Sequence, residues 1–132
     1  MGSFSHNWES LTWVIGDADT WVTLSGTTES ASSDIDFETS GQLGAHVVVK
    51  ADFDATPTDY VYVYLYGGDD GTNYVQTPYA TRRIDKATDP NGIDLVLQGD
   101  RTHHKVVCVQ SGSTDSHNVK VSLQKYTGEF AA

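Results

Sequence analysis

The residues that could do chemistry are the histidines and several aspartate pairs. The histidines are His6, His46, His103, His104 and His117. No two of these histidines have a His-x-x-x-His spacing, and the single cysteine, Cys108, has no Cys-x-x-Cys partner. The sequence therefore predicts no zinc site. No serine lies in a Gly-x-Ser-x-Gly turn, and no nucleophilic triad is recognisable. We therefore expect no catalytic residue, no metal and no cofactor.

The aspartate pairs are Asp17 with Asp19 and Asp69 with Asp70. Calcium takes six to eight oxygen ligands, and the spacing of an EF-hand loop is absent. We expect these aspartates to form turns and to face solvent. Two alternatives stay open at this point: a calcium ion held by two converging loops, and a carboxylate pair that cleaves a glycosidic bond.

His103 and His104 are adjacent residues of an expected strand, so their side chains should point to opposite faces. His104 shares its parity with Val106 and Cys108, which predicts that it borders the core. We expect Cys108 to be a buried, unreactive thiol. The stretch Val106–Val109 is apolar on both faces, which predicts a central strand or one that is covered from outside.

The clearest element that could position a binding surface is the run Asp59–Tyr66, which alternates strictly with period 2 and ends in Gly67-Gly68-Asp69-Asp70-Gly71. Such a pattern predicts a β-strand followed by a turn. One face is aliphatic and suits a sandwich core. The other is a row of tyrosines, which are apolar in body and polar at the tip and suit either cross-strand pairing or a contact surface.

Similar segments recur along the chain, and no helix is predicted. The expected strands are Asp19–Ser25, Asp34–Thr39, Gly44–Phe53, Asp59–Tyr66, Tyr74–Asp85, Gly92–Gln98, His103–Gln110 and His117–Tyr126. Their apolar residues lie at alternate positions, which is typical of antiparallel sheets that have one face exposed to solvent. The fold class predicted is all-β: a single antiparallel, jelly-roll-like β-sandwich of about eight strands with an extended N-terminal arm.

The expected organisation is an N-terminal arm over residues 1–18, a sandwich domain over 19–127 and a C-terminal tail over 128–132. The arm has aromatic residues without a clean period, and it either packs along its own domain or reaches a neighbouring subunit. Ser25–Ser33 is expected to be a flexible loop.

Composition narrows the class of partner. The 132 residues include 8 Lys and Arg against 18 Asp and Glu, a formal net charge of −10, which argues against a nucleic-acid partner. No signal peptide and no membrane span are visible, so synthesis in the cytosol and no membrane partner are expected.

The chain resembles small β-sandwich structural proteins of tailed bacteriophages and prophages. The resemblance rests on a strand and hairpin, Thr58–Tyr74, that reads Gly-x-x-Asp-Gly-x-Asn-Tyr at its end, with Arg83–Lys86 and Ser111–Asp115 fitting the same pattern. It covers roughly Asp34 to Tyr126. Asp-Gly-x-Asn-Tyr hairpins also occur in carbohydrate-binding and discoidin-like sandwiches.

The resemblance implies a non-enzymatic protein of the virion, made in the host cytoplasm and not secreted, that decorates or cements a capsid. Its partners would be the major capsid protein or other virion subunits, and its unit of assembly a homotrimer. The alternatives are a carbohydrate-binding module of an adhesin or tail tip, and a head–tail or tail connector. The residues expected at protein interfaces are Trp8, Trp13, Tyr60, Tyr62, Tyr64, Tyr66 and Tyr74.

Overall fold

The computed structural model describes residues 3–39, 41–86, 91–99 and 101–131. These residues form strands and no helix, as the alternation predicts, and so include no helix that could span a membrane. Eleven strands occur in the described part of the chain. They are β1 (Ser3–Trp8), β2 (Thr12–Ile15), β3 (Val22–Thr23), β4 (Ser30–Ala31), β5 (Ile35–Asp36), β6 (Gly44–Asp52), β7 (Val61–Gly68), β8 (Ala80–Ile84), β9 (Asn91–Gln98), β10 (His103–Gln110) and β11 (Asn118–Ala131).

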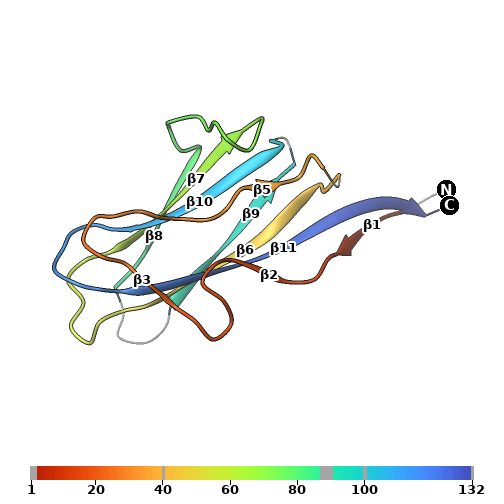
Figure 1. The fold of residues 1–132 in the computed structure, drawn as a ribbon. Coiled ribbons are helices and arrows are strands. Elements are labelled where there is room, and N and C mark those ends of the chain that lie inside the picture. Colours follow the sequence, from red (N-terminus) through yellow and green to blue (C-terminus); the bar gives the residue numbers. More distant parts are fainter. Residues whose placement is uncertain (1–2, 40, 87–90, 100, 132) are drawn as a thin grey trace.

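The strands form two antiparallel sheets that pack face to face (Figure 1). The first sheet has the order β1-β11-β6-β9, and β2 and β3 also pair with β11. The second has the order β4-β10-β7-β8, and β5 also pairs with β10. This arrangement confirms the predicted all-β sandwich.

The pairing is nested, as in a jelly roll. Counting β2 with β3 as one strand and β4 with β5 as the next, the sandwich has eight strands. The first pairs with the last (β11), the second with the seventh (β10), the third with the sixth (β6 with β9), and the fourth with the fifth (β7 with β8). Two rolled-up sheets of four result, which is the predicted jelly-roll architecture.

The core lies between the sheets and consists of the predicted inward rows. Val47 and Val49 of β6, and Val61 and Val63 of β7, are all fully buried. Directly opposite residues of paired strands share a face, so the register extends these rows across each sheet; Val47, for example, lies between Leu95 and Leu123. Strand parity alone therefore located the core correctly.

The short strands differ from the predicted ones. The expected strand Tyr74–Asp85 is reduced to Ala80–Ile84, because Pro78 has no N–H to donate to a ladder. Part of the expected loop Ser25–Ser33 pairs as β4. Within the N-terminal arm, β2 pairs with β11 across a register shift at Val121 and Ser122, which explains why its sequence shows no clean period.

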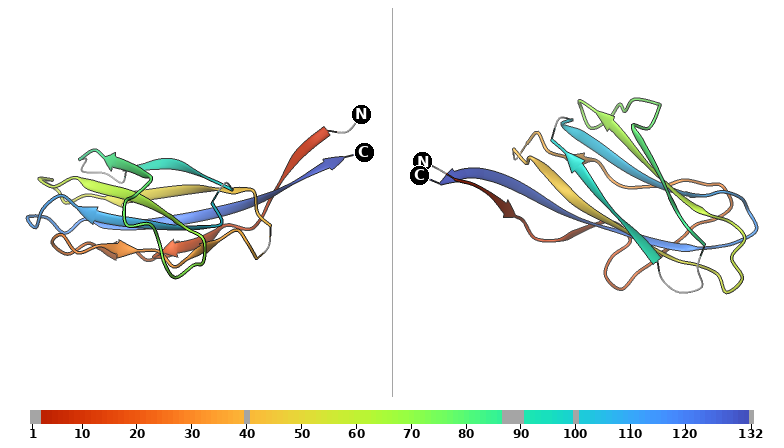
Figure 2. Two further views of the ribbon diagram at one scale, coloured as in Figure 1. Left: turned by 90° about the horizontal axis from the view of Figure 1, so that it is seen from above. Right: turned by 180° about the vertical axis from the view of Figure 1, so that it is seen from behind.

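The two ends of the described chain pair with each other. Every residue of β1 pairs with β11, from Ser3 opposite Ala131 to Trp8 opposite Tyr126. Tyr126 is also the last residue of β11 that pairs with β6. Beyond it, the terminal ribbon, formed by β1 and residues 126–131, projects away from the sandwich (Figure 2). Thus part of the predicted arm packs on its own sheet as β2 and part lies in the projecting ribbon, while residues 1, 2 and 132 of the predicted arm and tail lie outside the described residues.

Candidate protein-contact surface

Four of the predicted contact residues follow β7 on the outer face of the second sheet. Tyr62, Tyr64 and Tyr66 alternate with the core residues of the strand, and Tyr60 precedes it; all four are half-buried. The rings of Tyr62 and Tyr64 are nearly parallel, with centroids 6.4 Å apart. We call the surface formed by these four residues and Tyr74 the tyrosine face.

The tyrosine face covers an apolar strip of its own. Tyr62 pairs with Val109 and Tyr64 with Val107, and both valines are buried although they lie on the outer side of β10. This explains why β10 is apolar on both faces, since the strand is central in its sheet and the tyrosines cover its outer face. Part of the tyrosine row is therefore used within the fold, and the remainder of each ring is open to contact.

Cations lie over several of these rings. The Arg83 guanidinium is 4.4 Å and the Lys86 ammonium 4.5 Å from the centroid of the Tyr60 ring. Lys105 is placed between two rings, 5.2 Å from Tyr66 and 4.8 Å from Tyr74. Cation–π contact of this kind orients the rings and adds positive charge to an aromatic surface.

The two predicted tryptophans lie elsewhere, so the structure does not bring all seven predicted residues together. Trp8 is in the terminal ribbon, is 53% exposed and contacts the Tyr126 ring at a centroid distance of 5.0 Å. Trp13 is half-buried on β2, and the Lys120 ammonium lies over both Trp13 and Trp21. The candidate contact residues thus occupy two surfaces, one on each sheet.

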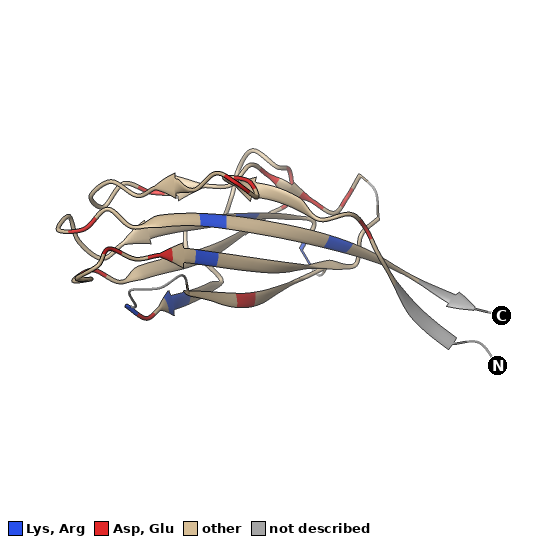
Figure 3. Ribbon diagram, turned by 90° about the horizontal axis from the view of Figure 1, so that it is seen from below, with Lys and Arg blue, Asp and Glu red and all other residues tan. Residues whose placement is uncertain are grey.

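Charge is distributed differently over strands and loops. Most lysines and arginines lie on strands, among them Lys50, Lys105 and Lys120, while acidic residues are concentrated in the connections (Figure 3). Several loop carboxylates accept hydrogen bonds from backbone N–H groups of the same loop. Asp70 accepts backbone N–H bonds from Asn73 and Thr72, which lower its pKa to about 2, and Asp17 accepts one from Asp19. These bonds support the interpretation of both aspartate pairs as turn formers.

Sequence reasoning missed a histidine cage on the outer face of the second sheet. His103 Nδ1 lies 2.8 Å from Asp34 Oδ2, and its Nε2 lies 3.1 Å from Glu38 Oε2 and 3.9 Å from Asp36 Oδ1. The bond to Asp34 raises the pKa of His103 most, followed by the bond to Glu38, while burial opposes them. The available signal is parity: Asp34, Asp36 and Glu38 alternate with the apolar Ile35 and Phe37, and the side chain of His103 points opposite to that of His104.

The cage also fastens the hairpin after β7. Tyr74 donates to Asp34, and burial together with this bond raises the pKa of Tyr74. Gly71 has a φ of 74° and approaches both Asp34 and His103 so closely that a Cβ atom would lie 2.9 Å from Asp34 Oδ2. Glycine at this position therefore meets two needs, the left-handed backbone and the close approach.

His104 and Cys108 are buried as predicted. His104 lies within hydrogen-bond distance of the Tyr79 hydroxyl and the Gln98 carbonyl, and its ring packs against Phe37. Burial raises the pKa of the Cys108 thiol to about 12, which makes it unreactive at neutral pH. Both residues belong to the core and not to a surface site.

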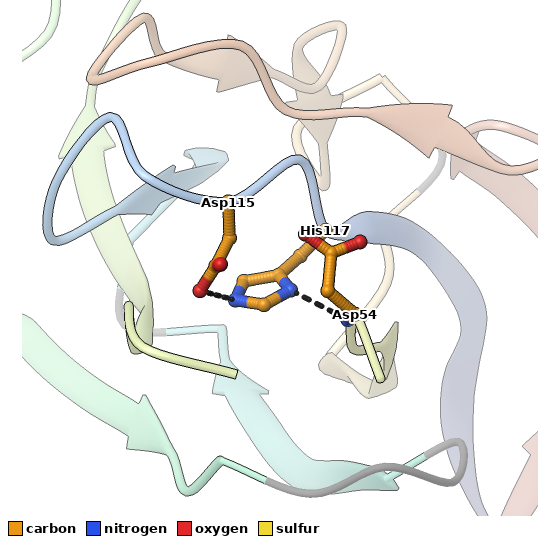
Figure 4. A group of neighbouring side chains, drawn as sticks. All are labelled: Asp54, Asp115 and His117. Carbon is orange, nitrogen blue, oxygen red and sulfur yellow. Dashed lines mark hydrogen bonds and ion pairs between the residues drawn. The ribbon is translucent and has the colours of Figure 1, made fainter. Parts of the chain in front are cut away.

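The one geometric candidate for a metal centre among the described residues consists of Asp54, Asp115 and His117 (Figure 4). His117 is fully buried, and each ring nitrogen already has a partner. Nδ1 accepts the Asp54 backbone N–H at 3.0 Å, so the ring proton is on Nε2, which lies 2.9 Å from the Asp59 carbonyl and 3.1 Å from Asp115 Oδ2. A metal ion would need a free nitrogen lone pair and would break one of these bonds.

Asp115 and His117, together with Asp59, form a clasp between two loops. Asp115 Oδ2 accepts the backbone N–H groups of Thr58 and Asp59, at 2.6 and 2.7 Å. In return, Asp59 Oδ2 accepts those of Thr114 and Asp115, at 3.0 and 2.9 Å. We call this arrangement of Asp59, Asp115 and His117 the loop clasp. It satisfies buried loop amides that no strand could pair, which is a structural role.

Comparison with known proteins finds no matching family model and no matching curated protein. The geometry of the described residues is therefore the basis for a functional proposal. It consists of a tyrosine face with cations on one sheet and a projecting ribbon with an exposed tryptophan on the other side.

Proposed function

We propose that this chain is a non-enzymatic structural protein that binds other protein subunits, as a decoration or cement protein of a tailed-phage capsid. The observation that carries the proposal is the terminal ribbon. A two-stranded ribbon without other cover is marginally stable at best in water. Its register places Trp8 opposite Tyr126, and the two rings are in contact with centroids 5.0 Å apart, so the ribbon carries an exposed aromatic pair at its base.

A neighbouring subunit would supply the cover that the ribbon lacks. We assign Trp8 to the seam between copies of a homotrimer, since aromatic anchors usually dominate interface energetics. Tyr62 and Tyr64, at the middle of the tyrosine face, are assigned to the capsid shell. The mechanism is mass action: a protein that binds only the assembled shell stabilises the shell in proportion to its occupancy.

A carbohydrate-binding module is the second candidate, because one part of the tyrosine face has polar groups beside its rings. A shallow cavity there is lined by Tyr66, Tyr74, Asn73, Gln76 and Lys105. Against this alternative, Lys105 already lies over the rings on which a sugar would stack. Binding of the isolated chain to a glycan array would favour the module, and the subunit proposal predicts none.

Light scattering on a sizing column tests the proposal. The wild-type chain is expected to elute with three times its 14.4 kDa mass. Trp8→Ala should elute as a monomer with unchanged β-type circular dichroism, because it removes the seam residue and not the core. Tyr62→Ala should remain a trimer but bind capsids less than the wild type does. Val96→Thr, on an exposed β9 position, serves as the control.

A wild-type monomer, or a trimer that Trp8→Ala leaves intact, would contradict the assignment of the ribbon as a seam. Capsid occupancy of Tyr62→Ala equal to that of the wild type would remove the tyrosine face from the shell contact. The two assignments can therefore fail separately.

A further inference from the structure

The sandwich is open between the edge strands of its two sheets, β8 and β9. β8 ends the second sheet and β9 ends the first, and among the described residues neither has a partner on its other side. A groove of about 470 Å³ lies between them, lined by Leu65, Ala80, Arg82, Leu95, Gln98 and Arg101 among others. Free strand edges present unpaired N–H and C=O groups to any extended chain that fits.

The register places Arg82 in the inward row of β8, where a sandwich usually has an apolar residue, but its side chain is exposed at the sheet edge. It pairs with Val63, and two positions later Ile84 pairs with Val61; Val63, Val61 and Ile84 are all buried in the core. Its described hydrogen bond goes from Nη1 to the carbonyl of Thr81, and no described carboxylate pairs with it. An arginine in this row places a positive charge at the groove.

The charges around the groove favour an acidic occupant. Arg101 lines the same groove, with its guanidinium 4.0 Å from the centroid of the Tyr79 ring. Asp94, the acidic lining residue, lies 3.4 Å from His46 on the outer side of the first sheet. In a molecule with a net charge of −10, the exposed Arg82 gives this mixed polar and apolar groove a local positive charge.

We propose that this groove binds an extended, acidic peptide segment of another protein, which adds as a strand to the free edge of β9. The partner backbone would pair with β9, and a carboxylate among its groove-facing side chains would face Arg82. Strand addition of this kind takes affinity from the backbone and specificity from alternate side chains. The charge of Arg82 favours a strand that carries a carboxylate over a neutral or basic strand.

Two blocked peptides test the proposal: Thr-Val-Thr-Glu-Thr-Val-Thr and the same sequence with Lys in place of Glu. Binding to the full chain is followed by the backbone amide signals of β8 and β9 in nuclear magnetic resonance spectra. The Glu peptide is expected to shift the β9 amides and to bind about tenfold more tightly than the Lys peptide. High salt should reduce this difference, because the groove is open to solvent.

Arg82→Glu should reverse the preference between the two peptides. Arg83→Glu is the matched control, because Arg83 has the same charge and strand but lies on the outer face, over Tyr60. The proposal is overturned by the absence of shifts in β9, by equal affinity for both peptides, or by an effect of Arg83→Glu as large as that of Arg82→Glu. The shifts of the β9 amides and the preference between the two peptides do not depend on the ribbon.

Discussion

At the scale of single residues, His103 is surrounded by carboxylates that lie far from it in the sequence. Strand parity predicts the face on which a side chain lies, but not the residues that it contacts. Parity placed His104 and Cys108 at the core and His103 on the outer face. It could not show that three carboxylates surround His103, because Asp34, Asp36 and Glu38 reach it from β5 and its flanks, far away in the sequence. Long-range side-chain pairing depends on the register between strands, which a single sequence does not encode locally.

The histidine cage predicts a pH-dependent stability. The pKa of His103 is raised in the folded protein, so its contribution is fully present below the ordinary histidine pKa and is lost as the pH rises through the raised value. We expect His103→Gln to lower the free energy of unfolding by about 1 to 3 kcal/mol at about pH 5.5, and by clearly less at about pH 9. Urea unfolding of both proteins at each pH measures the difference.

His46→Gln is the control for that comparison, since His46 is partly exposed and lies 3.4 Å from Asp94. A destabilisation by His103→Gln that is the same at both pH values, or matched by His46→Gln, would show that the ring packs but does not act through its charge.

At the scale of elements, regular alternation predicted the long strands well and irregular segments poorly. The eight expected strands contain β3 and β5 to β10 in whole or large part and most of β11, and their inward rows form the observed core. β2 and β4 were missed because a register shift interrupts one and the other is only two residues long. The loop clasp was missed for a related reason: nothing local in the sequence shows that Asp59 and Asp115 cap each other's loops.

The loop clasp predicts a large effect from one loop residue. Asp115→Ala removes the acceptor for two backbone N–H groups and leaves His117 without its carboxylate partner, all in a buried site. We expect a loss of roughly 2 to 4 kcal/mol in the free energy of unfolding, measured by urea titration. Asp69→Ala, in an exposed turn, should cost little.

The clasp also makes a prediction about metal. Because both nitrogens of His117 are hydrogen-bonded, treatment of the purified protein with EDTA should leave its thermal midpoint unchanged. A clear drop in the midpoint after EDTA, restored by zinc or calcium, would mean that Asp54, Asp115 and His117 hold an ion.

At the scale of the whole molecule, the sequence predicted the jelly-roll sandwich but not the path of its ends. The tyrosine row was recognisable from one strand, since period-2 alternation is local. That β1 pairs with the end of β11 was not recognisable, because the two segments lie at opposite ends of the chain and pair away from the core. We propose that association with other subunits joins these features, because the ribbon and the tyrosine face are not fully covered within the chain.

Hydrogen–deuterium exchange of the ribbon amides, measured at low and high protein concentration, tests this account most directly. An uncovered two-stranded ribbon should open readily, whereas one packed in a subunit seam should be protected. We predict that the amides of Ser3–Trp8 and residues 127–131 exchange rapidly in dilute protein and become protected as concentration rises, while β6 and β10 are protected throughout. Ribbon exchange that does not change with concentration would contradict the role of the ribbon as a seam between subunits.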